Sequence, residues 1–150
     1  MNCTGHVAPG IGSERTQTMR LDGVMIYVAD VAATVRFYEQ AFGMVVRTLN
    51  EDNQFAQMET GATTLPFAAE SAAGASDRTV RPNRLADEAA PAIQITLVTE
   101  TIQEAFARVA AAGGTVVNPP TEKPWGQVLG VVRDNSGVLI EVGTPQSDSW

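Results

Sequence analysis

The sequence predicts an α+β fold in which two β-α-β-β-β modules form one pseudo-symmetric, curved mixed sheet. Two observations predict it. Two helical segments share the same spacing of apolar residues, and an internal repeat with one constant offset carries these helices together with the strands around them. The length of 150 residues and the hydrophobic content of 44% suit a single domain with a substantial core.

The first helix is expected to begin after Asp30, a residue type that caps helix N-termini well. It is expected to end at Gly43, since glycine readily takes the left-handed conformation that follows a helix. One helical face carries its apolar residues, which are Val31, Val35, Tyr38 and Phe42. Tyr38 is therefore predicted to lie in the core.

The second helix is expected to begin after Thr101 and to end at the glycine pair 113–114. Thr101 and Glu104 have the spacing of a capping box, in which the two side chains bond reciprocally to backbone N–H groups. The apolar positions repeat the spacing of the first helix and are Ile102, Phe106 and Val109.

Corresponding positions of the two copies are separated by a constant offset in the sequence, the one that takes Asp30 to Thr101. Extending this offset to the last strand of each copy pairs Glu70 with Glu141. The expected strands are 21–28, 44–49, 54–59 and 63–69 in the first copy, and 92–99, 115–118, 127–133 and 138–143 in the second. Prolines 119 and 120 are expected to end the strand 115–118.

The predicted organisation has flexible tails at both ends and one domain made of two modules joined by a linker. We expect the linker to be mobile and able to close over a cup, although a plain disordered connector fits its Ala-, Ser-, Asp- and Arg-rich composition equally well. The boundaries are 1–20 for the first tail, 21–145 for the domain, with modules 21–70 and 92–145 and linker 71–91, and 146–150 for the second tail.

Composition excludes several classes of function. Ten basic and 17 acidic residues give a net charge of −7, which argues against nucleic-acid binding. One Cys and one His, at Cys3 and His6, exclude a disulfide framework and any site that needs several histidines from one chain. No apolar run is long enough to span a membrane and no secretory signal is recognisable, so a cytoplasmic location is expected.

The duplication resembles the vicinal oxygen chelate superfamily, which includes glyoxalase I, bleomycin-resistance proteins, fosfomycin-resistance enzymes and extradiol dioxygenases. The resemblance covers about residues 21–145 and is specific for the fold, a glyoxalase-like one, rather than for an activity. The segments that carry it are 28–31 (VADV), 36–38 (RFY) and 42–43 (FG), and then 124–127 (PWGQ), 132–134 (VRD) and 137–141 (GVLIE).

In the metal-dependent members of that superfamily, four ligands come from the opening and last strands of the two modules. The resemblance maps these positions onto Gly23, Glu70, Gln94 and Glu141. Three oxygen donors without an imidazole are a poor set for zinc or nickel. No cofactor is therefore predicted, and a weakly bound divalent cation remains conceivable.

The candidate ligand-binding residues are Tyr27, Glu70, Gln94, Trp125 and Glu141. Each has a structural alternative: Trp125 as a lid on the core, Gln94 as a buried hydrogen-bonding amide, and Glu70 as a solvated strand end. No catalytic residue is assigned, and Glu141 or Glu70 would be the base if the protein were an enzyme.

Three functions follow from the resemblance. The first is a homodimeric protein of the bleomycin-resistance kind that binds a small-molecule drug or metabolite in a dimer groove without a tightly bound metal. The second is a metal-dependent lyase, isomerase or dioxygenase of the glyoxalase kind with a degenerate metal site. The third is a non-catalytic member with a regulatory or unknown ligand. Neither a nucleic acid nor a membrane is an expected partner.

Overall fold

The computed structural model describes residues 19–146. The expected tails 1–20 and 146–150 fall almost entirely outside these residues, as do Cys3 and His6. No helix among the described residues is both long and apolar enough to cross a bilayer.

The first module consists of a helix packed on a four-stranded mixed sheet with strand order β1-β4-β3-β2. β1 runs parallel to β4, and the other pairs are antiparallel. Its elements are β1 (Ile26–Val28), α1 (Val31–Phe42), β2 (Val46–Leu49), β3 (Phe55–Met58) and β4 (Leu65–Ala69).

The second module repeats this arrangement with strand order β5-β8-β7-β6, in which β5 runs parallel to β8. Its elements are β5 (Gln94–Val98), α3 (Ile102–Ala112), β6 (Thr115–Glu122), β7 (Val128–Arg133) and β8 (Leu139–Gly143). The two similar modules confirm the predicted α+β, glyoxalase-like fold class, and each has its own four-stranded sheet where the sequence predicts one curved sheet.

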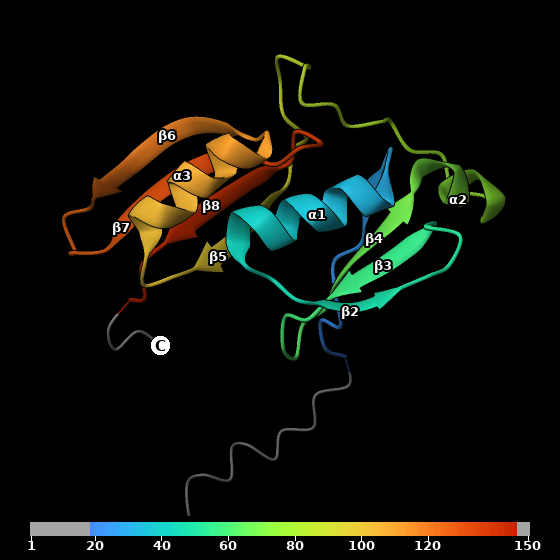
Figure 1. Ribbon diagram of the computed structural model, residues 1–150, viewed down its shortest axis with the longest axis horizontal. Coiled ribbons are helices and arrows are strands. Elements are labelled where there is room, and N and C mark those ends of the chain that lie inside the picture. Colours follow the sequence, from blue (N-terminus) through green and yellow to red (C-terminus); the bar gives the residue numbers. More distant parts are fainter. Residues whose placement is uncertain (1–18, 147–150) are drawn as a thin grey trace, which may run out of the picture.

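The two long helices lie next to one another on the same side of the sheets, in front of them in Figure 1. The core is one cluster that draws buried residues from both modules, among them Val28, Tyr38 and Phe67 from the first, and Val109 and Ile140 from the second. The opposite side of each sheet carries no helix among the described residues and is called its open face below.

Helix α1 begins and ends as the sequence predicts. The Asp30 side chain accepts a 2.9 Å hydrogen bond from the N–H of Ala33, and Gly43 has the left-handed φ of 66°. Tyr38 is fully buried, as expected.

The capping box predicted for α3 is wrong. The Thr101 side chain makes no cap hydrogen bond, and its hydroxyl lies 3.2 Å from that of Thr99 instead. The helix ends at Gly113, the first glycine of the predicted pair, so it is slightly shorter than α1.

The constant offset between the two copies does not hold in their last strands. Ile26 pairs with Phe67, and the offset takes these two residues to Leu97 and Val138. Leu97 pairs with Val142 instead. The second copy is therefore longer than the first between its helix and its last strand.

The additional length lies in β6, which continues through both prolines, contrary to prediction. This is possible because β6 is an edge strand with register shifts, so the missing N–H groups of the prolines do not interrupt the hydrogen bonds between strands.

The linker is anchored where it meets both modules. It opens with the short helix α2 (Glu70–Ala75), and Glu70 pairs with Arg84 farther along the linker. The guanidinium of Arg133 donates to the carbonyl oxygens of Asp87 at 2.7 Å and Arg84 at 3.3 Å, and so ties the linker to β7. These contacts order both ends of the linker, which a plain disordered connector would not have.

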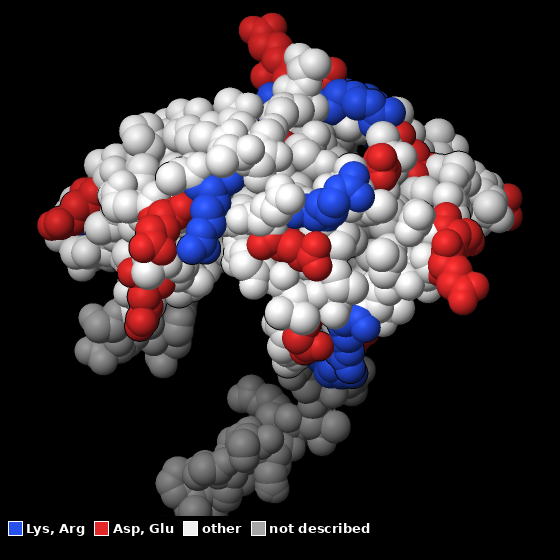
Figure 2. Space-filling model, viewed as in Figure 1, with Lys and Arg blue, Asp and Glu red and all other residues white. Residues whose placement is uncertain are grey.

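Figure 2 shows that charged side chains of both signs are scattered over the helical side of the molecule without a continuous basic patch. The same view shows a hollow at the lower edge, between the two modules.

Candidate functional site

Glu141 lies in the middle of the open face of the second sheet. Its neighbours Ile140 and Val142 on β8 point into the core, so strand alternation places Glu141 on the opposite side. The register sets it directly across from Thr96 on β5 and Val131 on β7. A carboxylate is thus surrounded by side chains of three adjacent strands.

Two shallow cavities meet at Glu141 and at Leu129. The first has a volume of about 320 Å³ and extends toward β6; it is lined by Asn118, Pro119, Thr121, Lys123, Leu129, Gly130, Val131 and Glu141. The second has a volume of about 460 Å³ and extends toward the edge strand β5; it is lined by Thr96, Val98, Gln127, Leu129, Glu141, Gly143, Pro145 and Gln146. The first cavity therefore combines polar and apolar side chains around the carboxylate, and the second is walled mainly by apolar surface.

The Glu141 carboxylate has no hydrogen bond or ion pair with another residue in the part of the chain that the structure describes. Lys123 lines the first cavity with it, but no ion pair forms between them. A half-buried carboxylate beside apolar side chains gains from a cationic partner, because such a partner restores interactions that water supplies elsewhere.

Trp125 lies in the turn between β6 and β7, with 60% of its surface exposed. Its indole Nε1 donates to Oε1 of Gln127 at 3.0 Å, and Gln127 in turn donates to the carbonyl oxygen of Thr144 at 2.8 Å. Because Gln127 lines the larger cavity, the indole is held beside the rim of that cavity. A fixed and exposed indole suits stacking on a planar or cationic group.

Glu70 is not in the last strand of its module, so its predicted equivalence to Glu141 is wrong. β4 ends at Ala69, and Glu70 begins α2, where Arg84 donates to both carboxylate oxygens at 2.6 and 2.9 Å. The hydrogen bonds from Arg84 hold the pKa of the Glu70 carboxyl below its ordinary value. β1 pairs with β4 in the first module as β5 pairs with β8 in the second. Aligning the two last strands by these registers makes Pro66 the structural counterpart of Glu141.

Tyr27 and Gln94 take different places. Gln94 shares the open face with Glu141 but is exposed at the start of β5, opposite Leu139. Tyr27 lines a separate cavity of about 170 Å³ between β1, the linker and the start of β5. The structure thus brings Glu141, Trp125 and Gln94 to one sheet and leaves Tyr27 and Glu70 elsewhere.

Sequence reasoning missed Thr96, Gln127 and Leu129 as site residues. Thr96 and Leu129 could have been found from strand alternation, because both occupy positions of β5 and β7 whose side chains point to the open face. Gln127 could be found only from the hydrogen bond that it makes with Trp125.

The four positions suggested for a metal do not form a site. A Cβ at Gly23 would collide with the Thr64 side chain, and the Glu70 carboxylate is held by Arg84. Within residues 19–146, no group of three or more His, Cys, Asp or Glu side chains is placed to hold a metal ion. One carboxylate with amide and hydroxyl neighbours does not fit a resident transition metal.

Comparison with solved structures shows the same fold. A glyoxalase-related enzyme from Fulvimarina pelagi is 18% identical, with a TM-score of 0.70 over 84% of this chain and 88% of that one. A glyoxalase/bleomycin resistance protein/dioxygenase family enzyme from Burkholderia phytofirmans PsJN is 20% identical, with a TM-score of 0.68 over 84% and 98%. TioX from Micromonospora sp. ML1 is 21% identical, with a TM-score of 0.61 over the same shares. No curated protein matches the chain.

The family comparison covers most of the sequence. The model of the Glyoxalase/Bleomycin resistance protein/Dioxygenase superfamily matches residues 20–142, which cover the first module, the linker and nearly all of the second module. The duplicated β-α-β-β-β architecture agrees with that match. The chain belongs to the Glyoxalase/Bleomycin resistance protein/Dioxygenase superfamily.

Proposed function

We propose that this protein binds a small cationic, partly planar molecule, a drug or a metabolite, on the open face of its second sheet without a tightly bound metal. The observation that carries the proposal is the Glu141 carboxylate, which lies between two cavities, the larger of them walled mainly by apolar surface, and has no hydrogen-bonding or ionic partner among the described residues. This is the role expected of a superfamily member of the bleomycin-resistance kind.

The physical argument combines charge with apolar contact. A ligand cation beside Glu141 forms a partly desolvated ion pair, which is stronger than the same pair in open water. Val98, Leu129 and Val131 offer apolar surface around it, and Trp125 offers an aromatic face at the rim. The net charge of −7 attracts cations to the molecule as a whole.

A metal-dependent lyase, isomerase or dioxygenase is the weaker proposal for this chain. Such chemistry needs a set of ligands around one ion; Gly23 has no side chain to donate, and the Glu70 carboxylate is already paired with Arg84.

Isothermal titration calorimetry against a panel of cationic glycopeptide and aromatic antibiotics tests the proposal. We expect at least one saturable interaction, and we expect Glu141→Gln to weaken it about tenfold, equivalent to about 1.4 kcal/mol. Glu51→Gln is the matched control, because it makes the same change of charge at an exposed turn of the first module.

Trp125 provides a second readout. Ligand stacking on the indole is expected to quench or shift the part of the fluorescence that Trp125→Phe removes. The proposal fails if no member of the panel binds, or if Glu141→Gln and Glu51→Gln bind equally well.

A further inference from the structure

The two modules pack against each other asymmetrically. The β7–β8 turn of the second module is buried against α1, where Tyr38 donates to Asp134 and Asn135 donates to the Thr34 hydroxyl. The corresponding β3–β4 turn of the first module leaves residues 61–63 exposed. One face of α3 therefore lacks the covering that the equivalent face of α1 receives.

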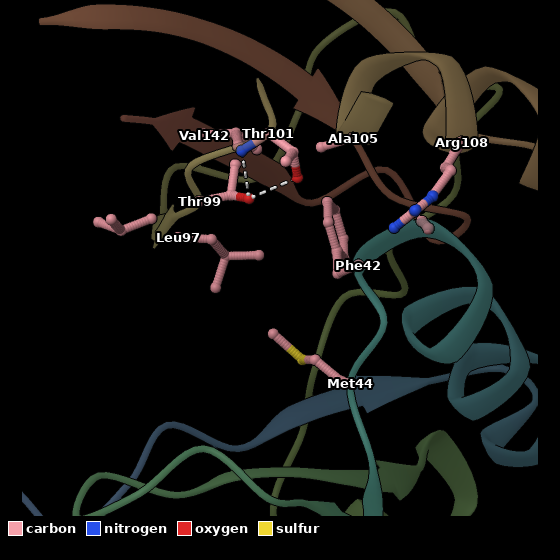
Figure 3. A pocket seen from close by; sticks show the side chains of 10 residues that line it. Phe42, Met44, Leu97, Thr99, Thr101, Ala105, Arg108 and Val142 are labelled. Carbon is pink, nitrogen blue, oxygen red and sulfur yellow. Dashed lines mark hydrogen bonds between the residues drawn. The ribbon is translucent and has the colours of Figure 1, made fainter. Parts of the chain in front are cut away.

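A cavity of about 250 Å³ lies at this uncovered face. Thr101, Ala105 and Arg108 point toward it from α3, and their spacing of four and three residues puts them on one side of the helix. The other walls come from the end of α1, the end of β5 and one residue of β8 (Figure 3); they are Ala41, Phe42, Met44, Leu97, Val98, Thr99 and Val142.

The cavity is separate from the site around Glu141. Leu97 and Val142 belong to the helical side of the second sheet, whereas Glu141 lies on its open face. Among the described residues, only Val98, on the edge strand β5, lines both.

The chemistry of the walls differs from one end to the other. Figure 3 shows Arg108 on one side of the Phe42 ring and the pair Thr99 and Thr101 on the other, with Met44 and Leu97 facing the space between. The hydroxyls of Thr99 and Thr101 are 3.2 Å apart, so one donates to the other. The accepting hydroxyl keeps its own proton for a further acceptor.

Arg108 is the only charged residue that lines the cavity in the described part of the chain. Its nearest carboxylate there is that of Glu104, one helical turn away at 3.5 Å, and the two side chains are 52% and 64% exposed. An exposed pair of this kind contributes little stability, so a ligand anion can replace Glu104 at small cost.

We propose that this cavity is a second ligand site, specific for a small carboxylate with an apolar or aromatic body. The carboxylate pairs with Arg108, the body packs between Phe42, Met44 and Leu97, and the threonine pair donates a hydrogen bond at the far end. The volume lies just below the range of drug-sized ligand pockets, so the occupant is smaller than the ligand proposed for the open face.

Titration of ¹⁵N-labelled protein with 3-phenylpropanoate tests this site by NMR. We expect saturable shift changes at the amides of Phe42, Met44, Thr99 and Ala105. Arg108→Gln is expected to weaken binding at least tenfold, and so is replacing the probe by uncharged 3-phenylpropanamide. Arg36→Gln, an exposed position on α1, is the matched control and is expected to bind like the wild type.

A filling substitution provides an independent arm. Ala105→Leu occupies the cavity and is expected to abolish the shift changes, with a circular dichroism spectrum that reports whether the fold is kept. The proposal is overturned if Arg108→Gln and Arg36→Gln bind the probe equally, or if the shift changes fall around Glu141 instead. It is also overturned if the cavity amides respond to protein concentration and not to the probe, since a second copy of the chain then covers them.

Discussion

The hydroxyl of Tyr38 donates a 2.6 Å hydrogen bond to Oδ2 of Asp134, and both side chains are fully buried. The bond joins α1 of the first module to the β7–β8 turn of the second. The other oxygen of Asp134 accepts hydrogen bonds from the N–H groups of Ser136 and Val138 at 2.8 and 2.9 Å. One carboxylate thus shapes a turn and fixes that turn against the neighbouring module.

Removing the Tyr38 hydroxyl is expected to destabilise the protein. Tyr38→Phe leaves Oδ2 of a buried carboxylate without its partner, which costs about 2 kcal/mol of unfolding free energy. Tyr27→Phe is the control, because no hydrogen bond joins the Tyr27 hydroxyl to another described residue. Urea unfolding of the two variants measures the difference, and equal losses would show that the bond between the modules contributes nothing.

The same pair predicts a loss of stability in alkali. Burial, and secondarily the charge of Asp134, raises the pKa of the Tyr38 phenol well above its ordinary value. The unfolded chain releases this proton near pH 10 while the folded chain keeps it. The contribution of Tyr38 is therefore complete below about pH 10 and is lost as the pH rises further.

Unfolding free energies at pH 8 and pH 11 check this prediction. The wild type is expected to lose more stability over this interval than Tyr38→Phe, because the variant has no phenol to titrate at that position. Identical losses in the two proteins would contradict the role assigned to Tyr38.

Arg133 is expected to hold the linker in place. Its guanidinium donates to the carbonyl oxygens of Gly137, Asp87 and Arg84 at 2.9, 2.7 and 3.3 Å. A lysine ammonium cannot reproduce this planar arrangement of several N–H donors. Arg133→Lys is expected to cost about 1–3 kcal/mol of stability. Faster amide hydrogen exchange is expected around residues 84–87.

The control is Arg78→Lys, since Arg78 is an exposed linker residue. Hydrogen exchange followed by mass spectrometry distinguishes the variants by segment. Unchanged exchange at residues 84–87 in Arg133→Lys would mean that other contacts hold the linker.

The local features of the fold could be predicted from the sequence because short-range chemistry determines them. The cap at Asp30, the glycine at position 43 and the apolar stripes identify both long helices without reference to the rest of the chain. The burial of Tyr38 follows from the same stripe, but its bond to Asp134 joins residues far apart in the sequence and has no local signal.

The candidate site could be predicted only in part. Strand alternation is a local signal for the position of Glu141, because Ile140 and Val142 beside it are apolar and point to the opposite side of the sheet. The prediction misplaces Glu70 because it assumes one constant sequence offset between the two modules. Structural equivalence of residues in the last strands depends instead on strand register, and the longer β6 shifts that register. The anchoring of the linker depends on a side chain of β7 that is remote in sequence.

A homodimer is expected from the free edges of the two sheets. β1 and β2 are the edges of the first sheet, and β5 and β6 are the edges of the second. On β6, Val116 and Val117 have 38% and 45% of their surfaces exposed. Prolines 119 and 120 remove N–H groups from the later part of β6, so the earlier part is the stretch able to pair with another strand.

Light scattering during size-exclusion chromatography is expected to give twice the mass of the chain. Val117→Lys places a charge on the edge of β6 and is expected to yield monomers, because a lysine on an edge strand opposes strand pairing. Val45→Lys is the control, since Val45 is 66% exposed in the connection between α1 and β2, away from that edge. A monomer at all concentrations would overturn the dimer, and dimers that survive in Val117→Lys would place the interface elsewhere. If the dimer does form through β6, the larger cavity beside Glu141 remains accessible, because it extends toward β5 rather than toward that edge.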